Sequence, residues 1–333
     1  MAQRPTSRPA SRRSLPRGFI AKRIQLSDGT RRKYAVFIPP QYETNTSHRW
    51  PVILFLHGSG EKGRNGINQT TIGLPVFVSR NAASFPFIVV APQAQEMWFR
   101  GKEAEAAWET LEAVHQEYRT DRDRVCLTGL SMGGFGAWEL AVLRPDIFAA
   151  IVPICGMAPK EYLSNIVNLP VWTFHGAQDE SVPVSGSRDA VVELRRLGGD
   201  PVYTEYPNLR HTCWDEAYAS KGLYRWLLQQ RRKPPPKVID YSFPGGLARV
   251  WWLAVESAED AARPMHVRAE IGDDGAVTIT SEGVAGLALV SNSEPLAPGT
   301  NIKVNWNGKT VFTGTFEGVF STKPFDAKAH APN

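Results

Sequence analysis

The sequence contains little cysteine and no long apolar run, and these two shortages narrow the class of protein. Three cysteines are scattered over 333 residues, and none has the paired spacing of a zinc site. No apolar stretch approaches the ~20 residues that a helix needs to cross a bilayer, so no membrane span is expected. The cysteine pattern predicts neither a disulfide framework nor a structural metal site.

Short motifs for cofactors and metals are also missing. The chain has no G-x-G-x-x-G dinucleotide turn, no phosphate-binding loop and no H-E-x-x-H pattern. Each of these patterns supplies the close backbone approach or the paired ligands that its cofactor requires. We therefore expect chemistry that uses no cofactor and no metal ion.

Positive charge is concentrated at the beginning of the chain. Of the formal net charge of +5, residues 1–33 carry +9, from ten Lys or Arg and one acid, which leaves −4 on residues 34–333. Because the body of the protein is not basic, no nucleic-acid partner is expected. Residues 1–17 are rich in Arg, Ser and Pro, which predicts a disordered tail. The tail lacks the apolar segment of a signal peptide, which favours a cytoplasmic location and leaves secretion open.

Residues 18–230 alternate between short apolar runs and helical patterns. The runs are bounded by Pro and Gly, as is typical of buried parallel strands. Helices are expected at residues 103–118, which have helical spacing, and at residues 218–230. This alternation predicts an α/β fold with a mostly parallel sheet covered by helices on both faces. Strands are expected at residues 34–38, 52–57, 87–91, 125–128, 149–154, 171–175 and 202–206.

The pattern changes at residues 231–237, which contain three consecutive prolines. Such a run cannot continue a helix and favours an extended spacer, so we expect a linker here. Beyond it, short strand patterns, including one at residues 249–255, alternate with turn signals such as Asn307-Gly308. Residues 238–333 are therefore predicted to form a small all-β, sandwich-like domain.

The segment Gly129-Leu130-Ser131-Met132-Gly133 lies between a strand pattern and a helix pattern. A sharp strand-to-helix turn flanked by glycines holds a serine exposed and points the next N–H at a developing oxyanion. A bare G-x-S-x-G is common by chance, but here both flanking elements are readable. We expect Ser131 to be a nucleophile and the Met132 N–H to be an oxyanion-hole donor.

An activated serine needs a base and a group that orients the base. Asp179 follows the strand pattern that ends at residue 175, and His211 follows the last strand pattern. The order serine, acid, histidine, each after a strand, is that of an α/β hydrolase. Asp189 falls inside a predicted helix and Asp215 lies only four residues after His211, so both are weaker candidates for the acid.

Three further residues are candidates for the same site. The loop after the strand at 52–57 is rich in glycine, which lets backbone N–H groups turn inward, so Ser59 is expected to be the second oxyanion donor. His57, at the start of that loop, is expected to be structural. Trp98 and Trp214 follow strand ends and are candidates to wall an acyl or aromatic pocket, with ordinary packing as the alternative.

These segments resemble the α/β-hydrolase esterases that include enzymes like polyhydroxybutyrate depolymerase, feruloyl esterase and dienelactone hydrolase. The resemblance covers residues 18–230. It implies a Ser131–Asp179–His211 triad and hydrolysis of short-chain or aromatic (acetyl- or feruloyl-type) esters, small or linked to polysaccharide, through an acyl-enzyme. A lid insertion like that of lipases is short here, which argues against long-chain lipids. The matching stretches are 50–58, 127–134, and Phe174-His175-Gly176 with Asp179, Val182 and Pro183.

Two other functions remain as alternatives. A serine peptidase of the prolyl-oligopeptidase type shares this core, but such enzymes usually carry a large β-propeller before it, for which 33 residues leave no space. A non-catalytic binding protein would retain the core as a relic and bind a polysaccharide or partner through the β domain. The intact order of the three candidate residues argues against it, and the sequence predicts no oligomeric state.

Overall fold

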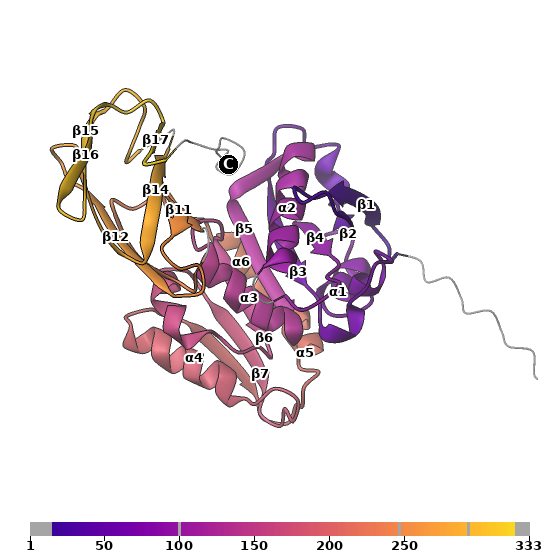
Figure 1. Cartoon of the computed structure of the whole chain (residues 1–333). Helices are drawn as coiled ribbons and strands as arrows, with labels where there is room; N and C mark the ends of the chain where they lie inside the picture. Colours follow the sequence, from indigo (N-terminus) through magenta and orange to yellow (C-terminus); the bar gives the residue numbers. More distant parts are fainter. Residues whose placement is uncertain (1–14, 99–100, 246–247, 292–293, 324–333) are drawn as a thin grey trace, which may run out of the picture.

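The computed structural model describes residues 15–98, 101–245, 248–291 and 294–323 (Figure 1). Most of the predicted N-terminal tail and the last ten residues of the predicted β domain lie outside these ranges. Leu15, at the start of the described part, packs against the core of the large domain, so the order of the chain begins before residue 18.

The larger part of the molecule is built on one eight-stranded sheet with the order β1-β2-β4-β3-β5-β6-β7-β8. β2 is antiparallel to both β1 and β4, and the other neighbours are parallel. The predicted α/β-hydrolase fold is confirmed. The strands are β1 (Phe19–Gln25), β2 (Arg31–Phe37), β3 (Trp50–Leu56), β4 (Ile88–Pro92), β5 (Thr120–Leu130), β6 (Ala150–Ile154), β7 (Trp172–Gly176) and β8 (Val202–Tyr206).

Helices cover both faces of this sheet. Alternate residues of β3 point to opposite faces: Val52 and Leu54 join one apolar cluster, and Ile53 joins the other. The first cluster also contains residues of α2, α3 and α4, and the second contains residues of α1, α5 and α6. The helices are α1 (Leu74–Arg80), α2 (Lys102–Glu117), α3 (Met132–Leu143), α4 (Ser185–Arg196), α5 (Trp214–Ala219) and α6 (Lys221–Gln229), with 3-10 helices η1 (Pro40–Tyr42), η2 (Ser59–Glu61), η3 (Asn68–Thr70) and η4 (Lys160–Ile166).

Several elements differ from the prediction. The edge strand β1 and the short helix α1 were not anticipated, because β1 is mostly exposed and lacks an apolar run. The helix expected near residues 218–230 is two helices, broken at Ser220, whose backbone is extended. Among the helices of the described ranges, none has the length and apolar character that crossing a bilayer requires.

The C-terminal residues form two further sheets around a separate apolar core (Figure 1). One sheet has the order β10-β11-β14-β17 and the other β16-β15-β13-β12-β9. The single strand predicted near 249–255 is instead a hairpin, because the chain turns at Trp251, which has a positive φ of 54°. The strands are β9 (Val238–Phe243), β10 (Ala248–Val250), β11 (Leu253–Ala258), β12 (Met265–Ile271), β13 (Ala276–Glu282), β14 (Val284–Val290), β15 (Asn301–Trp306), β16 (Lys309–Thr315) and β17 (Val319–Ser321).

The segment 231–237 is bound to the large domain and is not a free spacer. Arg231 and Arg232 both form ion pairs with Asp123 at 2.9 Å. The Arg232 backbone N–H also donates to the carbonyl of Asp123 at 2.7 Å. At its other end, the indole of Trp252 donates to the carbonyl of Pro236 at 2.8 Å. The arginines before the prolines therefore fix the direction in which the chain leaves the large domain.

The β domain packs on the amino ends of the parallel strands. The Tyr241 hydroxyl donates to the Val142 carbonyl at 2.6 Å, and the Asn165 amide exchanges two hydrogen bonds with the Ser242 backbone. A cavity of about 470 Å³ between the two parts is lined by segments that precede β6 and β7 and by β9. Catalytic groups of such sheets lie at the carboxyl ends of the strands. The β domain therefore lies at the end of the sheet opposite to the catalytic groups.

Candidate active site

Ser131 occupies a strained turn between β5 and α3. Its backbone has φ 53° and ψ −120°, a conformation that residues with a Cβ rarely adopt. The Ser131 N–H donates to the Ile154 carbonyl at the end of β6, at 2.9 Å, which anchors the turn to the sheet. Strain of this kind at a non-glycine residue is typical of functional sites, where it holds a side chain exposed.

Two glycines make this turn sterically feasible. A Cβ on Gly129 would lie 2.1 Å from the Gly133 carbonyl oxygen, and a Cβ on Gly133 would lie 2.0 Å from that of Leu56. These are backbone atoms of β3 and α3, which cannot move aside without disturbing the sheet. The two glycines therefore let the first turn of α3 pack directly against the carboxyl ends of β3 and β5.

The three predicted residues meet at the carboxyl edge of the sheet. The His211 Nε2 atom lies 2.8 Å from the Ser131 Oγ atom, and its Nδ1 atom lies 2.7 Å from the Asp179 Oδ2 atom. With Nδ1 protonated, the imidazole donates to the carboxylate and leaves Nε2 free to accept the serine proton. The side chain of Asp179 is fully buried, whereas that of His211 is 22% exposed. The base can therefore be reached from solvent while the acid cannot.

Asp179 is held in its ionised form by hydrogen bonds. Burial of the carboxylate would raise its pKa, but the hydrogen bond from His211 and the backbone N–H groups of Val182 and Ser181 outweigh burial and lower the pKa. Those two N–H groups donate to Oδ1 at 2.9 Å each, which leaves Oδ2 for the histidine. The Asp179 carboxylate therefore provides a fixed negative charge next to the His211 imidazole.

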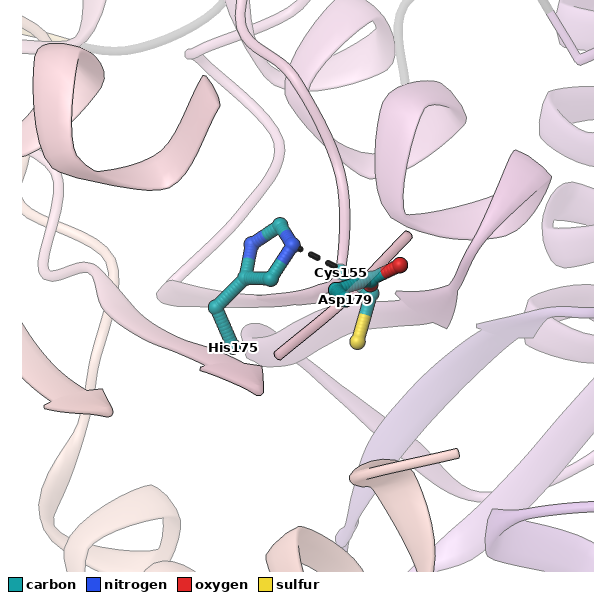
Figure 2. Close-up of side chains that lie close together, drawn as sticks. All are labelled: Cys155, His175 and Asp179. Atoms are coloured by element: carbon teal, nitrogen blue, oxygen red, sulfur yellow. Dashed lines mark ion pairs between the residues drawn. The ribbon is translucent and has the colours of Figure 1, made fainter. Parts of the chain in front are cut away.

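A second histidine, His175, also contacts the acid, and the dashed line in Figure 2 marks this contact. Its Nε2 atom lies 3.2 Å from Asp179 Oδ2 and 3.0 Å from the Val182 carbonyl oxygen, and its Nδ1 atom lies 2.7 Å from the Ser187 hydroxyl. Burial lowers the pKa of His175, so the ring is neutral at neutral pH. His175 therefore supports Asp179, a contact that the sequence did not reveal.

Cys155, His175 and Asp179 each place a possible ligand atom within 4.8 Å of the others (Figure 2). The chemistry of this set does not fit a metal ion. A thiol binds metals as the thiolate, and both the contact with Cys213 and burial raise the pKa of Cys155. In addition, Asp179 Oδ2 already accepts the hydrogen bond from His211. Cys155 Sγ and Asp179 Oδ2 are thus already in contact with Cys213 and His211, and the set is engaged in supporting the base.

The pKa of His211 is raised to about 9. The contact with Cys155 and the hydrogen bond to Asp179 raise it, while partial burial lowers it. Because the Cys155 thiol is itself held neutral, the carboxylate is the partner that stabilises the imidazolium at neutral pH. The site thus favours a histidine that takes up a proton.

The two expected oxyanion donors lie on neighbouring strand ends. Met132 is the first residue of α3, where a backbone N–H has no partner within the helix. Ser59 is exposed and begins η2, immediately after Gly58. A Cβ on Gly58 would lie 3.0 Å from the side chain of Leu130, the residue before the nucleophile, so this loop runs alongside the nucleophile turn.

His57 braces the loop that carries Ser59. Its buried ring lies 2.7 Å from the Gly58 carbonyl oxygen through Nδ1 and accepts the Ala94 N–H through Nε2 at 3.0 Å. Burial lowers the pKa of His57 to about 4, so the ring is neutral. It holds the loop after β3 to the loop after β4, in keeping with the structural role expected.

The structure does not place the two tryptophans as pocket walls. Trp98 is only 1% exposed, and its indole donates to the His57 carbonyl at 2.9 Å, so it supports the loop of Ser59 from inside. Trp214 is 7% exposed and meets the His211 ring edge-on at 5.3 Å. Of the two alternatives for Trp98, its burial favours ordinary packing under the loop, and Trp214 packs against the ring of the base.

Two methionines were missed by the sequence analysis. Met97 and Met157 are 40% and 38% exposed, and they lie in the loops that follow β4 and β6, at the same edge of the sheet as Ser131. Exposed methionine is a flexible apolar contact for varied ligands. The only signal for them in the sequence is that each is an apolar residue in a loop after a strand pattern.

Comparison with known proteins follows this geometry. The esterase family model, described as "Putative esterase", matches residues 27–197, which are 171 of the 333 residues. The chain belongs to this esterase family. The match includes Ser131 and Asp179 and ends before His211, so the histidine is assigned by geometry.

Individual relatives agree with the family. "Putative esterase NocK" of Nocardia uniformis subsp. tsuyamanensis is 24% identical over 58% of this chain and 58% of its own length. A thermostable esterase of known structure is 30% identical, with a TM-score of 0.60 over 66% of this chain and 64% of that one. A ferulic acid esterase (19% identity, TM-score 0.52, 63% and 96% coverage) and several peptidases share the fold. The resemblance to α/β-hydrolase esterases is thus confirmed, although the chain spans less than two thirds of the first two relatives.

Gly129→Ala should strongly destabilise the protein, because the new Cβ would overlap backbone atoms of α3 and β3. We expect a loss of about 3 kcal/mol or more in the free energy of unfolding, measured by urea denaturation. The matched control is Gly222→Ala in α6, where the nearest atoms lie at 3.7 Å and alanine favours the helix. An equal effect of both substitutions would contradict the proposed role of the close packing.

Proposed function

We propose that this esterase-family protein hydrolyses carboxylic esters through an acyl-enzyme formed on Ser131. The observation that carries the proposal is the continuous hydrogen-bond chain from Asp179 through His211 to the Ser131 Oγ atom, at 2.7 and 2.8 Å. This arrangement joins a nucleophile, a base and an orienting anion in reach of one substrate atom. The partial exposure of His211 beside a strained nucleophile turn further supports it.

In the proposed first half-reaction, Ser131 Oγ attacks the ester carbonyl carbon while His211 Nε2 takes the serine proton. The N–H groups of Met132 and Ser59 stabilise the tetrahedral oxyanion, and each such donor typically lowers the barrier by ~3 kcal/mol. The intermediate collapses to the acyl-enzyme as His211 protonates the departing alcohol. Water then attacks the acyl carbon with the same proton transfers and releases the acid.

The proposed substrates are esters of short acyl groups. The exposed side chains of Met97 and Met157 at the catalytic edge offer adaptable apolar contact of limited extent. Aromatic acyl groups, of the feruloyl type, remain a second class, but the burial of Trp98 removes one argument for them. If the ester is linked to a polysaccharide, surfaces outside the triad would bind the sugar chain.

Two alternatives share the same fold. A serine peptidase would use the same three residues on an amide, and peptidases occur among the solved structures with this fold. A binding protein would keep the geometry without turnover. The strain stored at Ser131 favours an enzyme, because such a turn is costly to maintain without a catalytic use.

Ser131→Ala should abolish turnover of p-nitrophenyl acetate, by at least ~10⁴-fold, because the nucleophile is lost. The wild type should also react covalently with a fluorophosphonate probe, and the variant should not. Circular dichroism checks that the variant is folded. Turnover that survives in the variant would remove Ser131 from the mechanism, and a wild type that does not label would favour the binding protein.

The pH profile should report the raised pKa of His211. Because only the neutral imidazole accepts the serine proton, kcat/KM should rise with pH, with its half-maximal value near pH 9 and its plateau at higher pH. Asp179→Asn removes the anion that stabilises the imidazolium, so the rise should shift to lower pH and the plateau should fall ~10⁴-fold.

The matched control for this profile is Glu180→Gln, which removes a neighbouring carboxylate that is 77% exposed and faces Arg210. The control should leave the profile of p-nitrophenyl acetate hydrolysis in place. A shift of equal size in both variants would show a general charge effect and contradict the assignment of Asp179.

A substrate panel should separate ester classes and test the peptidase alternative. We expect kcat/KM to decrease from acetate to longer p-nitrophenyl esters, and to be at least ~10³-fold lower for matched p-nitroanilides, since amides are the less reactive acyl compounds. Met157→Ala should lower kcat/KM for butyrate more than for acetate, because it removes apolar contact. Comparable rates on amides would favour the peptidase, and a preference for methyl ferulate would place the protein with aromatic esterases.

A further inference from the structure

Two cysteines lie directly behind the candidate catalytic base. The Sγ atoms of Cys155 and Cys213 are 2.8 Å apart, although the residues are 58 positions apart in the sequence. Cys155 immediately follows β6, and Cys213 lies two residues after His211, at the N-cap of α5. Both side chains are completely buried. The fold therefore brings together two thiols that the sequence showed only as scattered residues.

The contact is closer than ordinary packing. Non-bonded carbon atoms in a protein core approach to ~3.5–4.0 Å, and sulfur is larger than carbon. The two sulfur atoms thus need only a small adjustment of their side chains to bond. The remaining cysteine, Cys126 in β5, is also buried but has no such partner among the described residues.

We propose that Cys155 and Cys213 form a disulfide bond when the protein folds under oxidising conditions, and that this bond is a covalent brace for the catalytic loops. A small disulfide such as oxidised glutathione supplies the oxidant. One thiolate attacks it to give a mixed disulfide and releases one glutathione thiol, and the second cysteine then displaces the other. Overall, the two cysteines lose two protons and two electrons, and the glutathione disulfide gains both.

Because both thiols are buried in the folded protein, this step takes place during folding, before the site closes. In the folded protein the contact between the cysteines and their burial raise the pKa of Cys155, which disfavours the reactive thiolate. Once formed, the bond would be protected from external thiols by the same burial. The disulfide is therefore a stable modification and not a rapidly reversible switch.

The brace would connect the segments that hold the nucleophile and the base. The Ser131 N–H donates to the carbonyl of Ile154, the residue before Cys155, at 2.9 Å, and the Cys155 sulfur lies 3.2 Å from the His211 carbonyl oxygen. A bond to Cys213 would close a covalent loop that contains both Asp179 and His211. It would restrain their positions without contacting the reacting atoms.

Formation of the disulfide and its effect on enzyme activity are measured separately. Bond formation is tested by thiol chemistry and stability, which do not depend on the proposed function. The persistence of ester hydrolysis on heating rests on that function. If the protein proves inactive on all esters, the thiol count and melting temperature still decide whether the bond forms.

The test uses the full chain refolded in a mixture of oxidised and reduced glutathione. Titration with Ellman's reagent in denaturant should find one free thiol per chain, and three after reduction, because the chain has three cysteines. The oxidised protein should be about 2 Da lighter, and proteolysis without reductant should yield a peptide pair containing Cys155 and Cys213. Cys126→Ala is the matched control and should have no free thiol when oxidised. Three free thiols after refolding, or a bond that uses Cys126, would overturn the inference.

The stability measurement compares oxidised and reduced protein. Closing this loop should raise the melting temperature by about 5–15 °C, and p-nitrophenyl acetate hydrolysis should survive heating several-fold longer. The double variant Cys155→Ala/Cys213→Ala should show no response to reductant, which separates the bond from general effects of the reagent. A wild type whose melting temperature is unaffected by reduction would contradict the bracing role.

Discussion

The left-handed backbone of Ser131 is the constraint on which the rest of the site depends. The turn exists only because Gly129 and Gly133 carry no side chains where β3, β5 and α3 meet, at separations of about 2 Å for any added Cβ. A hydrogen bond to Ile154 fixes the turn to β6. The serine hydroxyl is consequently held toward His211, and the N–H of Met132, at the start of α3, has no partner within the helix.

Around this turn, buried polar groups support the acid and the base. Asp179 receives two backbone N–H groups and lies against the neutral ring of His175, so its charge is compensated without exposure to water. His57 and Trp98 hold the loop that carries Ser59 in place: His57 accepts the Ala94 N–H, and the Trp98 indole donates to the His57 carbonyl. In each case a buried side chain is itself held by further hydrogen bonds, as His175 is by Ser187 and Val182, and so positions the group that it contacts.

The β domain and the catalytic residues lie at opposite ends of the parallel strands. The β domain packs at the amino ends of the parallel strands through Tyr241 and Ser242, and the arginines at 231 and 232 hold the connecting segment. The catalytic residues lie at the carboxyl ends, and the thiol pair behind His211 joins them there. The candidate chemistry therefore belongs to the large domain, and the described contacts of the β domain lie at the other end of the strands.

Local patterns were sufficient to find the fold class and the three central residues. Apolar runs bounded by Pro and Gly mark each buried strand, so the order of Ser131, Asp179 and His211 after strand ends could be read from the chain alone. The strand at 249–255 was misread because a turn at Trp251 with positive φ leaves no local signal. The burial of Trp98, the contact between His175 and Asp179, and the meeting of Cys155 with Cys213 were decided only by the tertiary structure. Each depends on segments distant in sequence, whose approach is set by how the strand-end loops pack and not by the residues next to them.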